Sequence, residues 1–256
     1  MQIHFLGTGT SCGVPVIGCQ CEVCRSQDEK DKRTRCSLLV ETEQTRLLVD
    51  IGPDFRQQIL PLPFRRIDGI LITHSHYDHV GGMDDIRPFC QFGEINVYAD
   101  PIAREGMLQM LPYCFAEHRY PGVPAIGLHE IHAGQPLRIG DIDVMPIRVM
   151  HGKLPILGYR FGRGFAYITD MKTIDDDQLP LLEGVEALVV NALRFDKPHH
   201  SHQLVDDAVA FARRVGARRT LLIHMCHDIG LHEKVNTMLP EGVELAFDGQ
   251  VLNVAM

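Results

Sequence analysis

Four residues with metal-binding side chains stand close together in the sequence: His74, His76, Asp78 and His79. They follow the apolar run at residues 70–72, which is typical of a buried strand. Imidazole and carboxylate groups are ligands of Zn²⁺, Mn²⁺ and Fe²⁺. In open α/β sheets, ligands bind where a strand ends and a loop leads into a helix. The spacing therefore predicts a divalent metal site, with a solvated histidine turn as the alternative.

Three further candidates occur at wide intervals, each at the end of a short apolar run: His151, Asp170 and His224. Each one alone could be a hydrogen-bonded core residue or a helix cap. Together with the first cluster, they give seven candidate ligands at the ends of four predicted strands. Seven ligands are too many for one tetrahedral ion, and they suit two metal ions that share a bridging carboxylate.

The order and context of these residues resemble the metallo-β-lactamase superfamily. The H-x-H-x-D-H run, the later His, Asp and His, and L-V-D-I-G at residues 48–52 all match, so the resemblance covers nearly the whole chain. It implies that one metal ion is held by His74, His76 and His151. It implies that a second ion is held by Asp78, His79 and His224, with Asp170 as the bridge. Asp50 would support the metal-binding loop from behind the ligands, and the alternative is a plain turn aspartate.

The resemblance also implies the fold, an αβ/βα sandwich of two mixed β-sheets flanked by helices. A single domain would span residues 1–256, with the metals at one edge. Strands are expected at residues 1–5, 37–50 with a turn near 43–44, 67–73, 95–99, 128–131, 136–139, 142–149, 159–161, 166–169, 187–191 and 221–224. Those at 128–131, 136–139 and 142–149 are expected to be antiparallel. Helices are expected at 101–110, 173–182, 204–215 and 231–239, and a loop at 113–124.

The eight cysteines give a second signal, because three of them form a tight C-x-C-x-x-C motif at Cys19, Cys21 and Cys24. Three thiolates at this spacing can chelate one ion, and a fourth ligand would complete the tetrahedron of a structural zinc. The alternative is three reduced loop cysteines, because the spacing is too tight for a disulfide framework. The N-terminal residues lack the basic and apolar segments of a signal peptide, so a reducing, cytoplasmic location is expected.

The fourth zinc ligand is expected to be His227, which follows His224 by three residues. This arrangement resembles the PhnP-like phosphodiesterase branch of the superfamily, whose members pair an N-terminal C-x-C-x-x-C loop with a histidine at that position. The segments at residues 7–15 and 242–249 resemble the same branch. Cys226 departs from the small polar residue of that branch, so it stays open as an alternative fourth ligand.

The segment at residues 198–203 places three histidines just before a predicted helix. Cleavage of a phosphodiester requires protonation of the leaving alkoxide and neutralisation of the phosphorane charge, and a histidine beside the metals can do both. In the phosphodiesterase-like and tRNase Z-like branches, a histidine of this region has that role. The resemblance points to His202, with His199 as the second choice. The alternative is that Ser201 caps the helix and the histidines are solvated.

Composition limits the classes of partner. The chain has 256 residues, 45% of them hydrophobic, with a net charge of −8 and a pI of about 5.9. This acidic balance argues against a broad nucleic-acid surface. No apolar run approaches the roughly 20 residues of a membrane span. The expected partner is therefore a small phosphodiester substrate rather than a membrane or a nucleic acid, and a homodimer is left open.

The reaction is inferred from the predicted site. Two divalent ions can lower the pKa of a bridging water to about 7, and the hydroxide can attack a phosphodiester, a cyclic phosphate, a thioester or a lactam. A second site that contains Asp78 and no cysteine favours phosphate esters over lactams, so Asp78 and His202 are the expected catalytic residues. The prediction is a phosphodiesterase acting on a small or cyclic phosphate diester. Zn²⁺ and Mn²⁺ fit the ligands equally.

Two other branches of the superfamily are alternatives. A tRNase Z-like nuclease would need a long glycine-rich and basic insertion to grip tRNA, and the sequence shows none. A PqqB-like protein of cofactor biosynthesis shares the cysteine loop. The intact run from His74 to His79 argues against a repurposed site of that kind.

Overall fold

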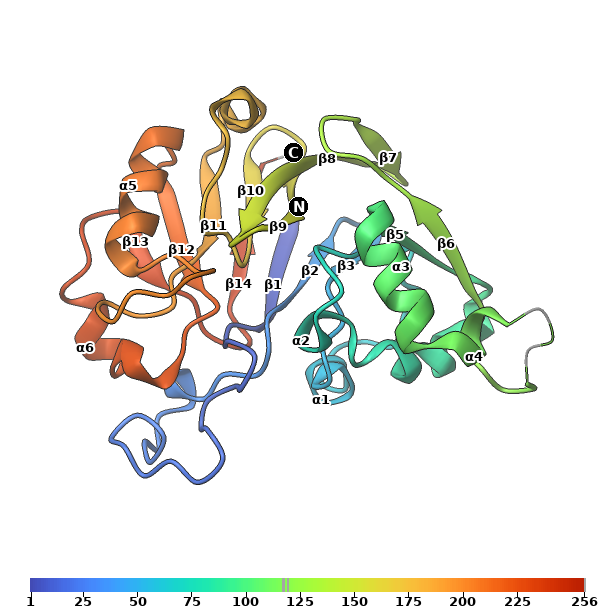
Figure 1. Ribbon diagram of the computed structural model, residues 1–256, viewed down its shortest axis with the longest axis horizontal. Helices are drawn as coiled ribbons and strands as arrows, with labels where there is room; N and C mark the ends of the chain where they lie inside the picture. The colour runs from blue at the N-terminus through green and yellow to red at the C-terminus, as the bar shows by residue number, and fades with distance from the viewer. Residues whose placement is uncertain (117, 119, 256) are drawn as a thin grey trace.

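The computed structural model describes residues 1–116, 118 and 120–255, which form two seven-stranded β-sheets packed against each other (Figure 1). The first sheet has the order β14 (Val251–Asn253), β1 (Gln2–Gly7), β2 (Ser37–Glu41), β3 (Arg46–Val49), β4 (Gly69–Leu71), β5 (Ile95–Ala99) and β6 (Ile126–Glu130). The second has the order β13 (Val243–Leu245), β12 (Arg219–Ile223), β11 (Ala187–Asn191), β10 (Phe165–Ile168), β9 (Leu154–Phe161), β8 (Ile142–His151) and β7 (Leu137–Ile139). Both sheets are mixed, with parallel pairing from β3 to β6 and from β10 to β13.

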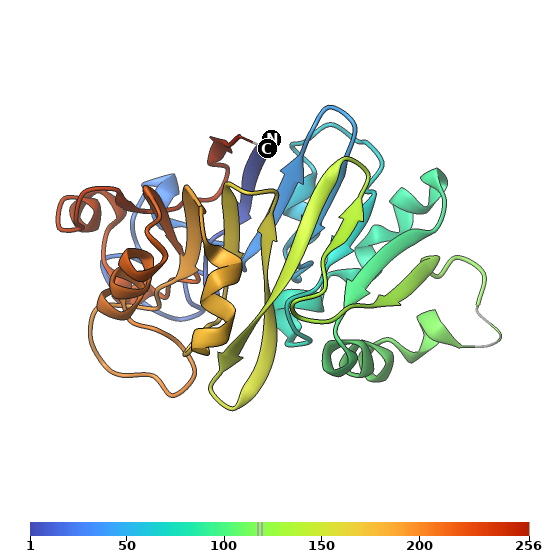
Figure 2. The same ribbon diagram turned by 90° about the horizontal axis from the view of Figure 1, so that it is seen from above.

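Helices cover the outer faces of both sheets (Figure 2). On the first sheet lie α1 (Phe55–Ile59), a 3-10 helix (Met83–Phe92), α3 (Pro101–Met110) and α4 (Pro112–Phe115). On the second lie a 3-10 helix (Asp176–Leu182), α5 (Val205–Val215) and α6 (His232–Asn236). Among the described residues, no helix has the length and apolar character needed to cross a bilayer. The predicted αβ/βα sandwich is confirmed.

The strands are apolar on both faces because each face packs against a different layer. On β2, Leu38 and Val40 face the second sheet in the central core, and Leu39 points into the layer beneath the helices. All three side chains are fully buried. Successive side chains of a strand point to opposite faces, so a strand between two apolar layers is apolar throughout. This explains why short apolar runs located most strands in the sequence.

Three predicted elements match the structure residue for residue: the strands at 95–99 and 187–191 and the helix at 101–110. The helix predicted at 173–182 is wrong, because only Asp176–Leu182 is helical and it is a 3-10 helix. Its first residues extend instead toward β8, where the backbone N–H of Met150 donates to Thr173 O at 2.8 Å. The helix predicted at 231–239 is shorter than expected, since α6 spans His232–Asn236.

The three strands predicted as one antiparallel group are divided between the sheets. β6 pairs in parallel with β5 in the first sheet, whereas β7 and β8 pair antiparallel in the second. The predicted loop at 113–124 begins inside α4, and its residues 117 and 119 lie outside the described part of the chain. The sequence reasoning missed α1, the 3-10 helix Met83–Phe92, β13 and β14.

Candidate metal centre

The candidate ligands gather at one edge of the sandwich, where the carboxyl ends of strands from both sheets meet beside α2 (Tyr77–Val80) (Figure 1). The run from His74 to His79 follows β4, His151 ends β8, Asp170 follows β10, and His224 follows β12. Two of these turns, and the turn after β3, have a non-glycine residue with left-handed backbone: Asp170 (φ 55°), His224 (φ 55°) and Asp50 (φ 59°). Such conformations are rare outside glycine and cluster at functional sites.

One group of candidate ligands consists of three histidines, His74, His76 and His151, whose ligand atoms lie within 4.8 Å of one another. Nε2 of His74 lies 3.0 Å from Nδ1 of His76. Nδ1 of His151 lies 3.0 Å from the carbonyl oxygen of Ser201. Because a carbonyl can only accept, Nδ1 of His151 carries the proton and its Nε2 is left as a lone-pair ligand.

The second group is Asp78, His79, Asp170 and His224, which are all buried and also lie within 4.8 Å of one another. Nε2 of His79 lies 3.4 Å from Oδ2 of Asp78 and 3.4 Å from Oδ1 of Asp170. Nε2 of His224 lies 3.2 Å from Oδ2 of Asp170. Two ligands of one tetrahedral ion, each bonded at about 2.1 Å, lie about 3.4 Å apart. The spacing of the second group therefore fits a shared ion.

Several nitrogens of this centre are buried without a hydrogen-bond partner among the described residues. They are Nε2 of His79, both ring nitrogens of His224 and Nδ1 of His202. An unpaired buried polar atom is costly, and native structures rarely leave one. A cation between the rings and the carboxylates would give Nε2 of His79 and Nε2 of His224 a partner.

The electrostatics of the centre also favour a cation. Burial would raise the pKa of Asp170, but the adjacent His224 and His79 outweigh it and hold that pKa well below its usual range. Burial would likewise lower the pKa of His79, yet the carboxylates of Asp170, Asp50 and Asp78 raise it well above its usual value. Three buried carboxylates thus flank one imidazole, and two of them, Asp78 and Asp170, lie on its Nε2 side, where a metal ion would lie.

Asp50 lies behind His79, on the side away from the other candidate ligands. Its carboxylate is fully buried and accepts hydrogen bonds from the backbone N–H and the hydroxyl of Thr73, each at 2.8 Å. It also lies 2.7 Å from Nδ1 of His79. This contact fixes the ring so that Nε2 points toward Asp78 and Asp170. A plain turn aspartate would not make these three contacts.

His202 lies beside both groups of candidate ligands. Its ring centroid is 4.7 Å from that of His151 and 4.7 Å from that of His224, and the residue is 8% exposed. Burial, together with the neighbouring His224, lowers the pKa of His202 to about 3, so the ring is neutral. With His151 and Asp170 it forms a third group of ligand atoms within 4.8 Å, which the sequence did not reveal.

The alternative role for Ser201 as a helix cap is wrong. α5 begins at Val205 and its N-cap residue is Leu204, so Ser201 lies outside the helix. The hydroxyl and the backbone N–H of Ser201 instead approach Nδ1 of His199, at 3.2 and 3.3 Å. The loop before α5 therefore holds its histidines in place.

The three cysteines and His227 form a separate cluster with ligand atoms within 4.8 Å of one another. Nδ1 of His227 lies 3.4 Å from Sγ of Cys19 and 3.3 Å from Sγ of Cys21. The backbone N–H of Cys24 and the His227 ring lower the pKa of Cys21 to about 6, which favours the thiolate form that binds metals. Cys226 is buried and is not part of the cluster, so His227 is the better placed fourth side chain.

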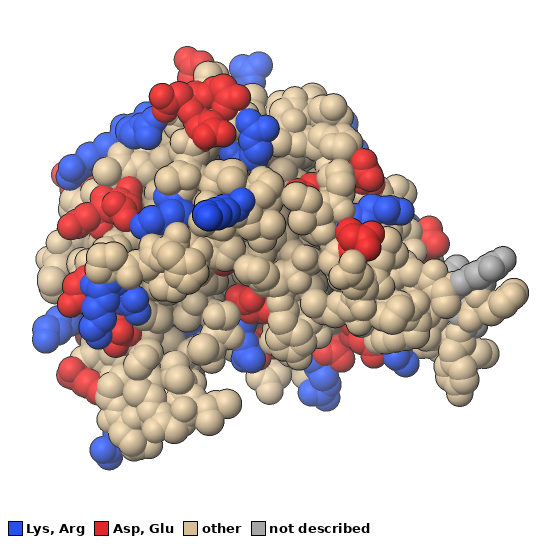
Figure 3. Space-filling view, in the orientation of Figure 1, with Lys and Arg blue, Asp and Glu red and all other residues tan. Residues whose placement is uncertain are grey.

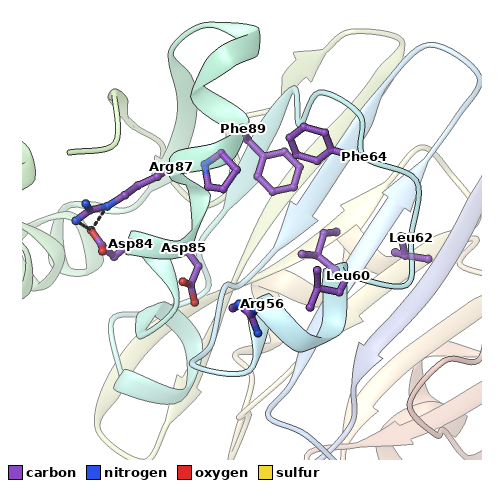
Figure 4. Close-up of a pocket in the computed structure, with 10 residues that line it drawn as sticks. Arg56, Leu60, Leu62, Phe64, Asp84, Asp85, Arg87 and Phe89 are labelled. Carbon is purple, nitrogen blue, oxygen red and sulfur yellow. Dashed lines mark hydrogen bonds and ion pairs between the residues drawn. The ribbon is translucent and has the colours of Figure 1, made fainter. Parts of the chain in front are cut away.

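Two surface features lie apart from the centre. On the face shown in Figure 3, acidic and basic side chains are interspersed rather than gathered into one broad basic surface. A cavity of about 610 Å³ lies between α1 and the 3-10 helix Met83–Phe92 (Figure 4). Its apolar wall includes Leu60, Leu62, Phe64 and Phe89, and none of the seven candidate ligands lines it.

The chain is similar to one known protein family and, along its full length, to a solved structure. Residues 45–225 match the family described as Beta-lactamase superfamily domain. The crystal structure of a diphosphatase from the PhnP family superposes with a TM-score of 0.91 and 36% identity, and it covers 100% of this chain and 98% of that one.

Two curated relatives carry different names. A protein of Porphyromonas gingivalis named octanoyltransferase is 42% identical over 97% of this chain. The chain spans only 51% of that protein's length. Coenzyme PQQ synthesis protein B of Methylobacterium nodulans is 26% identical over 74% of this chain and 72% of its own length.

Proposed function

Because the chain belongs to the metallo-β-lactamase superfamily, we propose that it is a binuclear metal-dependent hydrolase that cleaves phosphate esters of small molecules, either diesters or diphosphates. The observation that carries the proposal is the position of Asp170 between the two groups of candidate ligands. Its carboxylate lies 3.2 Å from Nε2 of His224 and 3.9 Å from Nε2 of His74. The similarity to a diphosphatase along the full chain supports phosphate as the reacting group.

Two divalent ions fit these residues. One would be held by His74, His76 and His151, the other by Asp78, His79 and His224, with Asp170 shared. The buried unpaired nitrogens of His79 and His224 support this assignment. Bound there, the ions would supply an activated water and would offset the negative charge of a phosphate group. The histidines and carboxylates suit Zn²⁺ and Mn²⁺ alike.

The protein's own side chains orient the ligands and assist the leaving group. Asp50 and the carbonyl of Ser201 fix the rings of His79 and His151 through their Nδ1 atoms. His202 is neutral, and we assign it the donation of an N–H to the oxygen that leaves the phosphorus. A neutral imidazole can stabilise a developing oxyanion in this way. Its place beside His151 and His224 gives it reach to a substrate bound at the metals.

A second candidate function is hydrolysis of a medium-chain thioester. It is favoured by the relative named octanoyltransferase, which is 42% identical to this chain. The same centre could direct water at a thioester carbonyl, since oxyanion stabilisation serves acyl and phosphoryl substrates alike. However, the chain spans about half of that relative, so octanoyl transfer can belong to the half that this chain does not match.

One substrate panel separates these functions. The metal-loaded protein would be assayed with bis(p-nitrophenyl) phosphate, a dinucleoside diphosphate, an octanoyl thioester and a precursor tRNA. Hydrolysis of one or both phosphate esters, abolished by Asp170→Asn, is the expected result. Turnover of the thioester alone would establish the second candidate, and cleavage of the tRNA alone would establish a tRNase Z-like nuclease. No turnover of any substrate would leave a PqqB-like role and would contradict a hydrolase.

We also propose that Cys19, Cys21, Cys24 and His227 hold a structural zinc ion. Four ligands complete a tetrahedron and leave no open position for a substrate. No disulfide bond joins the described cysteines, which is typical of a reducing compartment, and we therefore propose a cytoplasmic location. The cluster stands next to the catalytic centre, because His224 and His227 lie three residues apart.

A further inference from the structure

Four imidazole rings form a row that leads from the buried metal centre to the surface. The row begins at His224, continues through His202 and His199, and ends at the exposed His200. Successive ring centroids lie 4.7, 4.8 and 4.5 Å apart, and the interplanar angles are 29°, 30° and 31°. His224 is assigned to a metal and His202 to the leaving oxygen, so the third ring, His199, is without a role.

Local hydrogen bonding decides which nitrogen of His199 carries the proton. The backbone N–H of Ser201 donates to Nδ1 of His199 at 3.3 Å, so Nδ1 must accept. The proton of the neutral ring is therefore on Nε2. In the described part of the chain, Nε2 of His199 has no protein partner, and it is not among the buried unpaired atoms. This nitrogen is therefore accessible to solvent.

The loop that carries His199 is held firmly. Nζ of Lys172 donates to the carbonyl oxygen of His202 at 3.1 Å, and the carbonyl oxygen of Ser201 accepts from Nδ1 of His151 at 3.0 Å. The backbone N–H of Gln203 donates to Met171 O. A donor on a fixed loop loses little conformational entropy when it meets a ligand.

The surroundings of His199 favour an anion over a metal ion. None of the groups of clustered ligand atoms among the described residues includes His199. Besides the neighbouring rings of His200 and His151, two permanently basic side chains, Arg194 and Lys172, act on its ring. Because His202 is assigned to the leaving oxygen, we place a second phosphate joined through that oxygen beyond His202, where the next ring of the row is His199.

We propose that His199 is a specificity-determining residue whose Nε2–H binds the second phosphate of a diphosphate substrate while His202 serves the phosphate under attack. The inference rests on the proposed function and narrows its substrate class to esters that carry two linked phosphates. It also gives a role to the solvent-accessible Nε2–H of His199, which neither the metal centre nor the leaving group uses.

The test compares two substrates in the metal-loaded protein. His199→Phe keeps a flat ring against His202 and removes the N–H. A hydrogen bond to a charged group contributes about 1.5–3 kcal/mol, so the ratio of kcat/KM for a dinucleoside diphosphate over bis(p-nitrophenyl) phosphate should fall about 10- to 100-fold. His199→Gln, which retains an N–H donor, should recover part of the ratio. His132→Phe, at an exposed histidine outside the row, is the matched control.

Inhibition by inorganic anions gives a second readout. Inorganic diphosphate should inhibit the wild-type protein more tightly than inorganic phosphate, and His199→Phe should lose this preference. Equal losses of kcat/KM on both substrates would show that His199 only supports His202, and wild-type kcat/KM on both substrates would show that it binds no phosphate. Either outcome overturns the inference and leaves the proposed function intact. Failure of the wild-type protein to cleave either substrate contradicts the proposed function itself.

Discussion

At the scale of single residues, the atoms behind the ligand set decide what the ligands can do. The carboxylate of Asp50 and the carbonyl of Ser201 each occupy the Nδ1 side of a histidine, so Nε2 is turned toward the metal position. Such supporting contacts fix the tautomer and the orientation of a metal-binding ring. His202 differs, because its buried Nδ1 has no hydrogen-bond partner among the described residues and its ring is neutral.

Replacement of His202 tests its assignment to the leaving group. His202→Ala should retain both active-site metals by elemental analysis, because seven other residues form the two main ligand groups. Turnover of an ester with a poor leaving group should fall by roughly 10²–10⁴-fold. The loss should be smaller with p-nitrophenolate, which needs little help to leave. Loss of a metal ion in the variant would show instead that the third group, with His151 and Asp170, coordinates an ion.

At the scale of elements, the sequence was most informative where the signal is local. The helix at 101–110 was predicted correctly, and the structure shows local signals at its start: Asp100 caps it, accepting from the N–H of Ala103 at 2.7 Å, and Pro101 is its first residue. The run from His74 to His79 was recognisable because six residues carry the whole pattern. In contrast, β14 is a three-residue edge strand. It pairs with β1, which lies at the other end of the sequence, so no local pattern predicts it.

The loop contacts could not be predicted for a related reason. The bonds of Ser201 to His199 and of Met150 to Thr173 depend on backbone positions that only the packed sandwich defines. Thr173, the acceptor of the bond from Met150, lies at the start of the predicted helix, where the chain is extended instead. Because Met150 and Thr173 are far apart in the sequence, the spacing of apolar residues could not predict this bond.

Two loops approach so closely beside the metal centre that only glycine fits. A Cβ atom on Gly82 would lie 2.1 Å from the carbonyl oxygen of Gly52 and 3.0 Å from Cβ of Phe55. Gly82→Ala should therefore destabilise the fold by about 1–3 kcal/mol and shift α2, which carries Asp78 and His79. Chemical denaturation and metal analysis would measure both effects. Gly164→Ala, where an added Cβ meets only ordinary contacts, is the control; equal behaviour of the two variants would refute the steric argument.

The cysteine loop should bind its zinc independently of the catalytic ions. Cys21→Ser removes one of four ligands, so bound zinc should fall by about one ion per chain and the melting temperature should drop. Cys12→Ser changes an exposed cysteine outside the cluster and should keep the full zinc content. If the Cys21→Ser protein kept its full zinc content, Cys21 would not be a zinc ligand and the proposed structural site would be wrong.

At the scale of the whole molecule, a buried polar network joins the segment after the cysteine loop to the C-terminal part of the chain. Arg33 is 3% exposed and donates to the carbonyl oxygen of Ala246. Its guanidinium also lies 3.3 Å from Nδ1 of His232, whose backbone N–H donates to Asp31 at 2.7 Å. Burial and the charge of Arg33 lower the pKa of His232 to about 4.

This network makes stability depend on pH. The folded pKa of His232 lies below the unfolded value of 6.5, so its contribution to stability is complete above pH 6.5 and is lost as the pH falls toward 4. The wild-type free energy of unfolding should fall across that interval by on the order of 2 kcal/mol more than that of His232→Gln. His132→Gln, at an exposed histidine, should follow the wild type. Parallel stability curves for wild type and His232→Gln would contradict this account.

At Asp50, Asp170 and His224 the backbone is left-handed, so a substitution that stabilises the fold at these positions would also remove a side chain that the metal centre uses. Side chains other than glycine are strained there by on the order of 1–2 kcal/mol per residue. Glycine at Asp170 or His224 would relieve that strain and would also remove a buried carboxylate or imidazole from the metal centre. Selection for heat resistance alone would therefore tend to erase the site, and variants that gain thermal stability at these positions should be the ones that lose the metals.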